Sequence, residues 1–399
     1  MQEKNRRAPK GHLRWVSSTV IALACMGAAY YSLRIAYAEY LFRSGRPGTI
    51  GRAAALAPLR ADYQARLNRL DRAVKLNPYL SPAWIELGLR AEAAGDAAKA
   101  EAALREAARV DRTFEPRWTL ANFYFRRGNR DEFWKWIRAA AEMSYGDRSG
   151  LFQLCWRATA DPQTILDRAI LSDRHLLADY VDYLGRTERY PAAQSAASRW
   201  LSMASKEDVP GLLRFCDLLI EKAHDTAGAL RIWNALIENE WLPFQELNLN
   251  AGSVVTNGTF RTPAISHGFD WRPLSRPGVR ATSHEGLGIT LDGHQEEQTD
   301  FLIQWLPLRP SSTYELTIKA QSVDIPAGSG LRSKILDAST GTVLAESAIS
   351  TPVSILRFET FPHSSLGELV LGYQRALGNS RIAGTVAFTS VAMVPVLRR

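Results

Sequence analysis

The feature that most constrains this chain is an uncharged stretch of nineteen residues near its N-terminus, from Trp15 to Leu33. At about 1.5 Å of rise per residue, a helix of this length covers roughly 28 Å, close to the ~30 Å hydrocarbon core of a bilayer. We therefore expect a single membrane anchor over residues 15–40. Five basic residues and one acidic residue precede it in residues 1–14, and the positive-inside rule predicts that this basic tail stays in the cytoplasm.

Two alternatives to a retained anchor stay open. Ala36-Tyr37-Ala38 has the small-x-small form that a signal peptidase cuts after, which would make the segment a long cleaved signal peptide. Against this, the apolar run is longer than a usual signal-peptide core, and Arg34 lies between it and the site. Cys25 follows Ala22-Leu23-Ala24 as in a lipoprotein cleavage box, but a larger aliphatic residue is usual at the position of Ala22.

The charge distribution gives no sign of a nucleic-acid partner, and the cysteine spacing gives none of a metal site or a redox motif. Of the net charge of +8 over 399 residues, the first fourteen supply +4, and no Lys/Arg run with interleaved aromatic residues follows, so we expect no nucleic-acid partner. The three cysteines, Cys25, Cys155 and Cys216, form no C-x-x-C pair and no metal spacing. Cys155 and Cys216 could form a disulfide in an oxidising compartment.

Residues 50–245 have apolar residues three and four apart, which predicts helices. Trp84 recurs 34 residues later at Trp118, and a 34-residue period is the tetratricopeptide length. The first unit has its packing residues at the positions typical of that repeat: Trp84, Leu87, Gly88, Ala91, Ala100, Leu104, Ala107 and, closing the preceding unit, Pro78. This region resembles a tetratricopeptide-repeat domain, whose second unit here, residues 118–142, is degenerate. The resemblance implies stacked helix pairs with an elongated concave surface that holds protein segments.

Six aromatic residues fall within residues 123–136, more than one inter-helix core easily buries. One interpretation is an exposed groove for a protein partner, with Tyr124, Trp134 and Trp136 as its binding residues. The alternative is that alternate members of the set fill the core.

Residues 247–399 are rich in Gly, Thr, Ser and Val, with about eight strand-length runs, several of them alternating apolar and polar residues. This predicts an antiparallel β-sandwich or jelly roll. Short motifs follow one another in a fixed order: Asn257-Gly258-Thr259-Phe260, Gly268-Phe269-Asp270-Trp271, residues 287–293, Gln304-Trp305 and residues 308–314. In this order they resemble the jelly-roll carbohydrate-binding modules of the 4/9-like group.

The resemblance implies sugar recognition by aromatic ring faces, with polar side chains reading hydroxyl groups. The candidate residues are Trp271, Trp305, Asp270, Gln304 and Tyr373. The alternative is that both tryptophans are core residues and Asp270 forms a turn. Family members often hold a structural calcium, but Phe388-Thr389-Ser390-Val391-Ala392 lacks the usual Asp/Asn pair and Thr259 replaces a frequent acidic residue. We therefore expect no metal.

No nucleophile elbow, phosphate loop, dinucleotide fingerprint or H-E-x-x-H motif is present in the sequence. An acidic cluster could in principle supply the paired carboxylates of a glycoside hydrolase, although such clusters in loops are usually solvated. Its members are Glu285, Asp292, Glu296, Glu297 and Asp300. We expect no enzyme activity and no cofactor.

Taken together, the sequence predicts a multidomain α + β chain with one transmembrane helix, a helical-repeat solenoid and an antiparallel sandwich. By analogy of architecture it resembles accessory proteins of exopolysaccharide or O-antigen assembly and export. The predicted location is the bacterial inner membrane, with the bulk of the chain periplasmic. The repeats would bind protein partners and the sandwich polysaccharide. The alternatives are a pure protein-interaction scaffold and a polysaccharide hydrolase.

Overall fold

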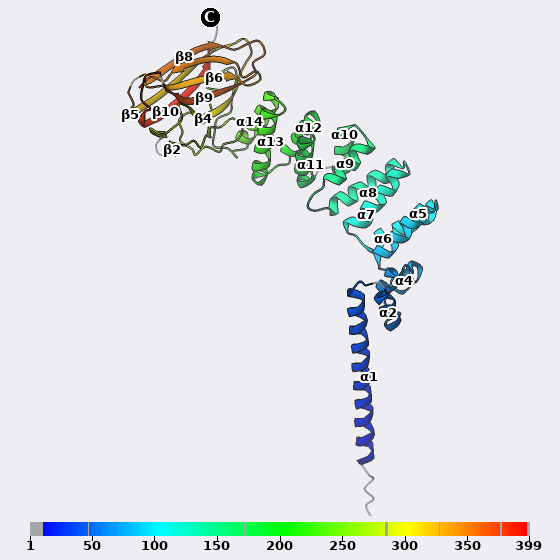
Figure 1. Cartoon of the computed structure of the whole chain (residues 1–399). Coiled ribbons are helices and arrows are strands. Elements are labelled where there is room, and N and C mark those ends of the chain that lie inside the picture. The colour runs from blue at the N-terminus through cyan, green and yellow to red at the C-terminus, as the bar shows by residue number, and fades with distance from the viewer. Residues whose placement is uncertain are drawn as a thin grey trace, which may run out of the picture. The chain divides into compact units, whose positions relative to one another are not determined.

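The computed structural model of the chain describes residues 11–46, 48–170, 173–283, 286–326, 328–375 and 377–396 (Figure 1). The chain divides into two compact units, Met1–Leu171 and Ser172–Arg399. The first is helical, and the second holds further helices together with the strands. Residues 1–10 of the predicted basic tail, and Glu285 of the acidic cluster, lie outside the described residues.

The apolar stretch forms one helix, α1 (Gly11–Arg43), and its Thr19–Arg43 part is long and apolar enough to cross a membrane. Side chains from Val20 to Tyr31 are exposed. Ala38 and Leu41, near the end of the helix, are instead buried against Ala53 and Tyr63. The same helix therefore carries the apolar stretch and contributes its last turns to the core of the first unit.

The remaining helices of the first unit pack as short hairpins. They are α2 (Thr49–Leu56), α3 (Ala61–Arg66), α4 (Leu70–Leu76), α5 (Ser81–Ala93), α6 (Ala97–Val110), α7 (Phe114–Arg126), α8 (Arg130–Met143), α9 (Ser149–Ala158) and α10 (Pro162–Ile165), followed by the π-helical turn Leu166–Ile170.

The predicted helical repeat is confirmed in the pairs α5–α6 and α7–α8. A Cβ atom at Gly88 would lie 2.5 Å from Leu104 Cγ, so only glycine lets these two helices approach as they do. Each second helix begins with a side-chain cap, because Asp96 accepts from the amide of Lys99 and Asn129 from that of Glu132. The turns that contain these caps fix the hairpin geometry.

The second unit continues with α11 (Arg174–Arg186), α12 (Tyr190–Leu201), α13 (Val209–Glu221) and α14 (Thr226–Glu238), with a short 3₁₀ turn, Lys206–Asp208, before α13. Cys155 in α9 and Cys216 in α13 are free, fully buried thiols, each enclosed in its own unit. The two thiols are therefore not joined by the disulfide that the sequence left open.

The described strands form two five-stranded antiparallel sheets, which confirms the predicted sandwich. One sheet has the order β1-β4-β9-β6-β7 and the other the order β2-β3-β10-β5-β8. The strands are β1 (Arg272–Pro273), β2 (Val279–Ser283), β3 (Leu287–Asp292), β4 (Gln298–Pro307), β5 (Thr313–Val323), β6 (Leu331–Asp337), β7 (Val343–Ala348), β8 (Val353–Glu359), β9 (Leu366–Gln374) and β10 (Ala383–Pro395). Phe301, Tyr314, Phe388 and other large side chains fill the space between the sheets.

Helices α13 and α14 pack directly against the sandwich. One carboxylate oxygen of Asp217 accepts the backbone N–H of Gly268 and the guanidinium of Arg272, both at 2.7 Å, while the other bonds to the ring of His267. On α14, the Asn234 amide pairs with both the N–H and the C=O of Leu247 at 3.0 Å. The sandwich and this helix pair therefore form one packed body.

Gly268 is a sensitive point of this contact. It has φ of +55°, and a Cβ atom there would lie 2.4 Å from the Trp233 ring. We expect Gly268→Ala to lower the free energy of unfolding by about 3 kcal/mol, because backbone strain and overpacking add. The measurement is urea unfolding of the full chain in detergent, followed by near-UV circular dichroism.

Gly252 is the matched control, since it also has a positive φ, +80°, but no atom within 4 Å of an added Cβ. Gly252→Ala should cost only about 1 kcal/mol of backbone strain. Equal losses in the two variants would contradict the role given to the contact with Trp233.

Candidate functional site

Four of the five residues predicted to contact glycan lie in the interior of the sandwich. Trp271, Asp270, Gln304 and Tyr373 are each at most 1% exposed. The Trp271 indole donates to the carbonyl of Asn257, and its ring packs on Phe260. A ring enclosed in this way offers no face to a sugar. For Trp271 the burial agrees with the alternative that it is a core residue.

Asp270 and Gln304 hold the segment that precedes β1 in place. The Gln304 amide donates to the carbonyls of Thr256 and Phe269, and Asp270 accepts the backbone N–H of Ile265 at 2.7 Å. Burial raises the pKa of Asp270 to about 6, although the hydrogen bonds from Ile265 and Trp271 oppose that effect. These two polar side chains therefore have a structural role, which is to bond the backbone of the segment before β1.

Trp305 is the predicted residue that remains partly exposed. It lies on β4 opposite Glu368 of β9. Because strand side chains alternate, Trp305 lies on the face of the sheet opposite to Leu306, which is in the core. Trp305 therefore belongs to the outer face of the β1-β4-β9-β6-β7 sheet.

Charged side chains share that outer face with Trp305. The strand register places Asp300, Gly372 and Arg332 in one row across β4, β9 and β6, and Lys334 lies opposite Val370 in the next. The sequence had signalled only Asp300, as a member of an acidic cluster. Arg332, Lys334 and Glu368 were missed, although they occupy alternate positions along their strands and so share one face.

Several polar groups of this face are sunken and incompletely bonded. The side chain of Arg332 is only 10% exposed and bonds to Glu346 at 2.9 Å and to Gln374. Among the described residues, its Nε and Nη2 and the Nε1 of Trp305 have no hydrogen-bond partner, and all three atoms are buried. The Nη2 atom lies 3.8 Å from Asp300. Burial and the nearby charge of Asp300 raise the pKa of Glu368. The accessible part of the Trp305 ring, beside the carboxylates of this face, can stack on a sugar ring.

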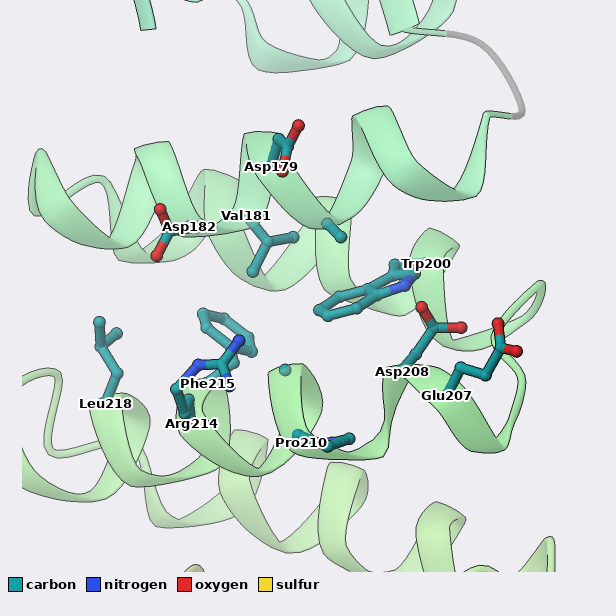
Figure 2. A pocket seen from close by; sticks show the side chains of 12 residues that line it. Asp179, Val181, Asp182, Trp200, Glu207, Asp208, Pro210, Arg214, Phe215 and Leu218 are labelled. Carbon is teal, nitrogen blue, oxygen red and sulfur yellow. The ribbon is translucent and has the colours of Figure 1, made fainter. Parts of the chain in front are cut away.

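A second candidate site is a pocket of about 520 Å³ lined by α11, α12 and α13 (Figure 2). Apolar side chains, Val181, Trp200, Phe215 and Leu218, line its interior. Carboxylates gather around it, with Asp179 and Asp182 on one wall and Glu207 and Asp208 on the other, as Figure 2 shows. Arg214 is the basic residue among the pocket's lining residues.

The acidic rim is partly neutralised by its neighbours. Arg174 lies 3.1 Å from Glu207 and 3.4 Å from Asp208, and Arg186 lies 3.0 Å from Asp182. Glu207 and Asp182 nevertheless remain 82% and 67% exposed, so both can meet an incoming cation. The pocket depends on Gly211, because a Cβ atom there would lie 2.7 Å from the Trp200 ring.

The residues predicted to form a protein-binding groove in the first unit are mainly core residues. Tyr124 is 2% and Trp134 is 5% exposed. The Tyr124 hydroxyl donates to Glu101 at 2.7 Å, and Trp134 packs edge-on against Phe133. Trp136 is half-buried, and its indole donates to Glu132 at 2.9 Å. The aromatic set therefore fills the space between helices, with Phe125 and Trp136 partly accessible.

No protein-family model matches the chain, and the curated proteins contain no significant match to it. Among solved structures, the chain is similar to one described as "CBM4 structure and function", at 19% identity over 36% of this chain and 99% of that one, with a TM-score of 0.28. It is also similar to TmCBM61 in complex with β-1,4-galactotriose, at 14% identity over 37% and 100%, with a TM-score of 0.26.

The helical part is similar to YrrB, described as a tetratricopeptide-repeat protein with an unusual peptide-binding site. Identity is 13% over 42% of this chain and 91% of that one, with a TM-score of 0.24. The structural neighbours thus include tetratricopeptide-repeat proteins and carbohydrate-binding modules.

Asp270 should make the stability of the sandwich depend on pH. Its pKa is about 6 in the folded chain, against about 4 when unfolded, so between these values the folded state holds a proton that the unfolded state releases. Stability from this group therefore falls as pH rises from about 4 to about 6, by roughly 3 kcal/mol in total.

Asp270→Asn keeps an oxygen that accepts the Ile265 amide and removes the titration. We expect urea unfolding between pH 4 and pH 7 to show a flatter pH dependence in the variant than in the parent chain. Parallel curves would show that Asp270 is charged in the folded state throughout this range.

Proposed function

We propose that this protein is a membrane-anchored, non-catalytic scaffold in bacterial envelope polysaccharide assembly or export, of the exopolysaccharide or O-antigen type. Its helices would bind a protein partner, and its sandwich would contact glycan. The N-terminus would lie in the cytoplasm and the bulk of the chain on the periplasmic side of the inner membrane. The architecture of anchor, helical repeat and sandwich supports this proposal by analogy.

The packing of α1 supports a retained anchor. The signal-peptidase site would follow Ala38, but this residue lies inside a continuous helix and is fully buried against the core of the first unit. A peptidase needs an accessible, extended bond. Cleavage after Ala38 would remove Ala38 and the partly buried Ile35 from that core.

The pocket between α11 and α13 is the observation that carries the protein-binding role. It combines an apolar interior with an acidic rim, which suits a protein segment with apolar and basic side chains. The glycan role rests on a different observation, the outer sheet face with Trp305, Arg332 and Glu368.

A pure protein-interaction scaffold remains the first alternative and a polysaccharide hydrolase the second. The acidic cluster gives the hydrolase little support. Arg375 binds Glu297 and Asp292 accepts the backbone N–H of His294. These carboxylates thus have local structural partners.

Glycan binding can be tested on the full chain in detergent, with a glycan array and the host's own surface polysaccharide. We expect binding that Trp305→Ala weakens at least about tenfold, because the indole supplies the apolar platform. Ile355→Ala is the matched control, since Ile355 is 61% exposed on β8 of the other sheet. If no glycan binds, the pure protein scaffold is favoured. If glycan binds and both variants bind it equally well, Trp305 is not the platform and the outer sheet face is excluded as the site.

The protein-binding role can be tested by photo-crosslinking in cells. A benzophenone side chain at Ala178, which lines the pocket, should form one defined protein adduct, whereas the same group at exposed Ser198 should not. Asp182→Lys should reduce the adduct several-fold by reversing a rim charge. Asp131→Lys, which reverses an 89% exposed carboxylate on α8, is its control. The same adduct yield in both variants would contradict recognition by the acidic rim.

A further inference from the structure

The positive charge of the chain is concentrated beside the anchor. Residues 43–75 contain eight Lys and Arg residues and two Asp residues, a net charge of +6. Residues 1–14 carry a further +4, so the net charge of these two segments together is larger than the +8 of the whole chain. Residues 76–399 carry a net charge of −2. We call residues 43–75 the juxtamembrane basic segment; it comprises α2, α3 and α4 and the turns between them.

Direct contacts hold this segment close to the membrane end of α1. Glu39 of α1 accepts hydrogen bonds from Arg60 at 3.3 Å and from the Tyr63 hydroxyl at 2.8 Å. Glu39 is five residues beyond Arg34, where the apolar stretch ends, which is about 7.5 Å along the helix axis. Arg60 and Tyr63 therefore lie within about one Debye length of the bilayer edge at physiological salt.

Most cations of the segment are unpaired. Arg43 pairs with Glu39, and Arg60 with Glu39 and Asp62. The other six basic side chains are exposed and form no ion pair with any residue that the structure describes: Arg46, Arg52, Arg66, Arg69, Arg72 and Lys75. Leu59, next to Arg60 in the turn before α3, is 76% exposed. The segment thus combines free cations with an exposed apolar tip.

We infer that the juxtamembrane basic segment docks on the anionic phospholipid headgroups of the bilayer that α1 spans. Charge complementarity and the covalent, helical continuity with the anchor both identify this occupant. Each Lys or Arg near an anionic membrane surface adds attraction that decays within a Debye length. The first unit would then rest on the membrane through α2–α4. The inference rests on the retained anchor of the proposed function.

The test is arginine labelling by phenylglyoxal, read by mass spectrometry, on the full chain in lipid nanodiscs. One set of discs contains phosphatidylcholine alone, and the other contains about one quarter phosphatidylglycerol. We expect Arg46, Arg52, Arg66, Arg69 and Arg72 to react about fivefold more slowly in the anionic discs. The protection should disappear near 1 M salt, where the Debye length is about 3 Å.

Exposed arginines of the same unit outside the segment, Arg112, Arg127 and Arg130, are internal controls and should react equally in both discs. The triple variant R66E/R69E/R72E should lose protection at Arg46 and Arg52. The matched triple variant R112E/R127E/R130E should keep that protection.

Equal labelling of the segment in both discs, with the chain shown to be inserted, would overturn lipid docking and leave the anchor intact. Failure of the chain to enter discs at all would overturn the anchor and the docking together. Failure of glycan or partner binding has no bearing on either result, so the two proposals fail separately.

Discussion

The carboxylate of Asp217 is the interaction on which the second unit depends. It lies on α13 and is 19% exposed, yet it binds the backbone amide of Gly268, the imidazole of His267 and the guanidinium of Arg272, the first residue of β1. Removing it would leave Arg272, whose side chain is 14% exposed, without its closest counter-charge. The helix pair and the sandwich are thus joined by a polar contact as well as by the apolar packing around Trp233.

This junction also affects the candidate glycan face. Arg272 pairs with Ile303 in the β1–β4 register, at the edge of the sheet that carries Trp305. Its positive charge lowers the pKa of Glu368, against the larger effect of burial. Helix α13, through Asp217, therefore holds Arg272 in the position from which it lowers the pKa of Glu368. A module cut at residue 247 would lose Asp217 and with it this arrangement, which is why binding is best measured on the full chain.

Sequence periodicity was sufficient to predict the helical repeat and the sandwich, because amphipathic periods follow directly from burying one face of an element. It was not sufficient for the sites. The direction of Trp305 depends on the register of β4, which shifts at a bulge between Asp300 and Leu302. Trp271 is buried because the loop before β1 folds over it, a tertiary contact that no period encodes. The pocket at Trp200 likewise needs three helices to meet.

The two docking surfaces proposed for this chain differ in charge. Residues 76–399 are nearly neutral with a slight negative excess, and the rim of the α11–α13 pocket is acidic. An anionic headgroup layer would attract the juxtamembrane basic segment, whereas the pocket rim has the sign that suits a basic protein segment. The two proposed docking surfaces thus have opposite charge and lie on different helices, α2–α4 and α11–α13.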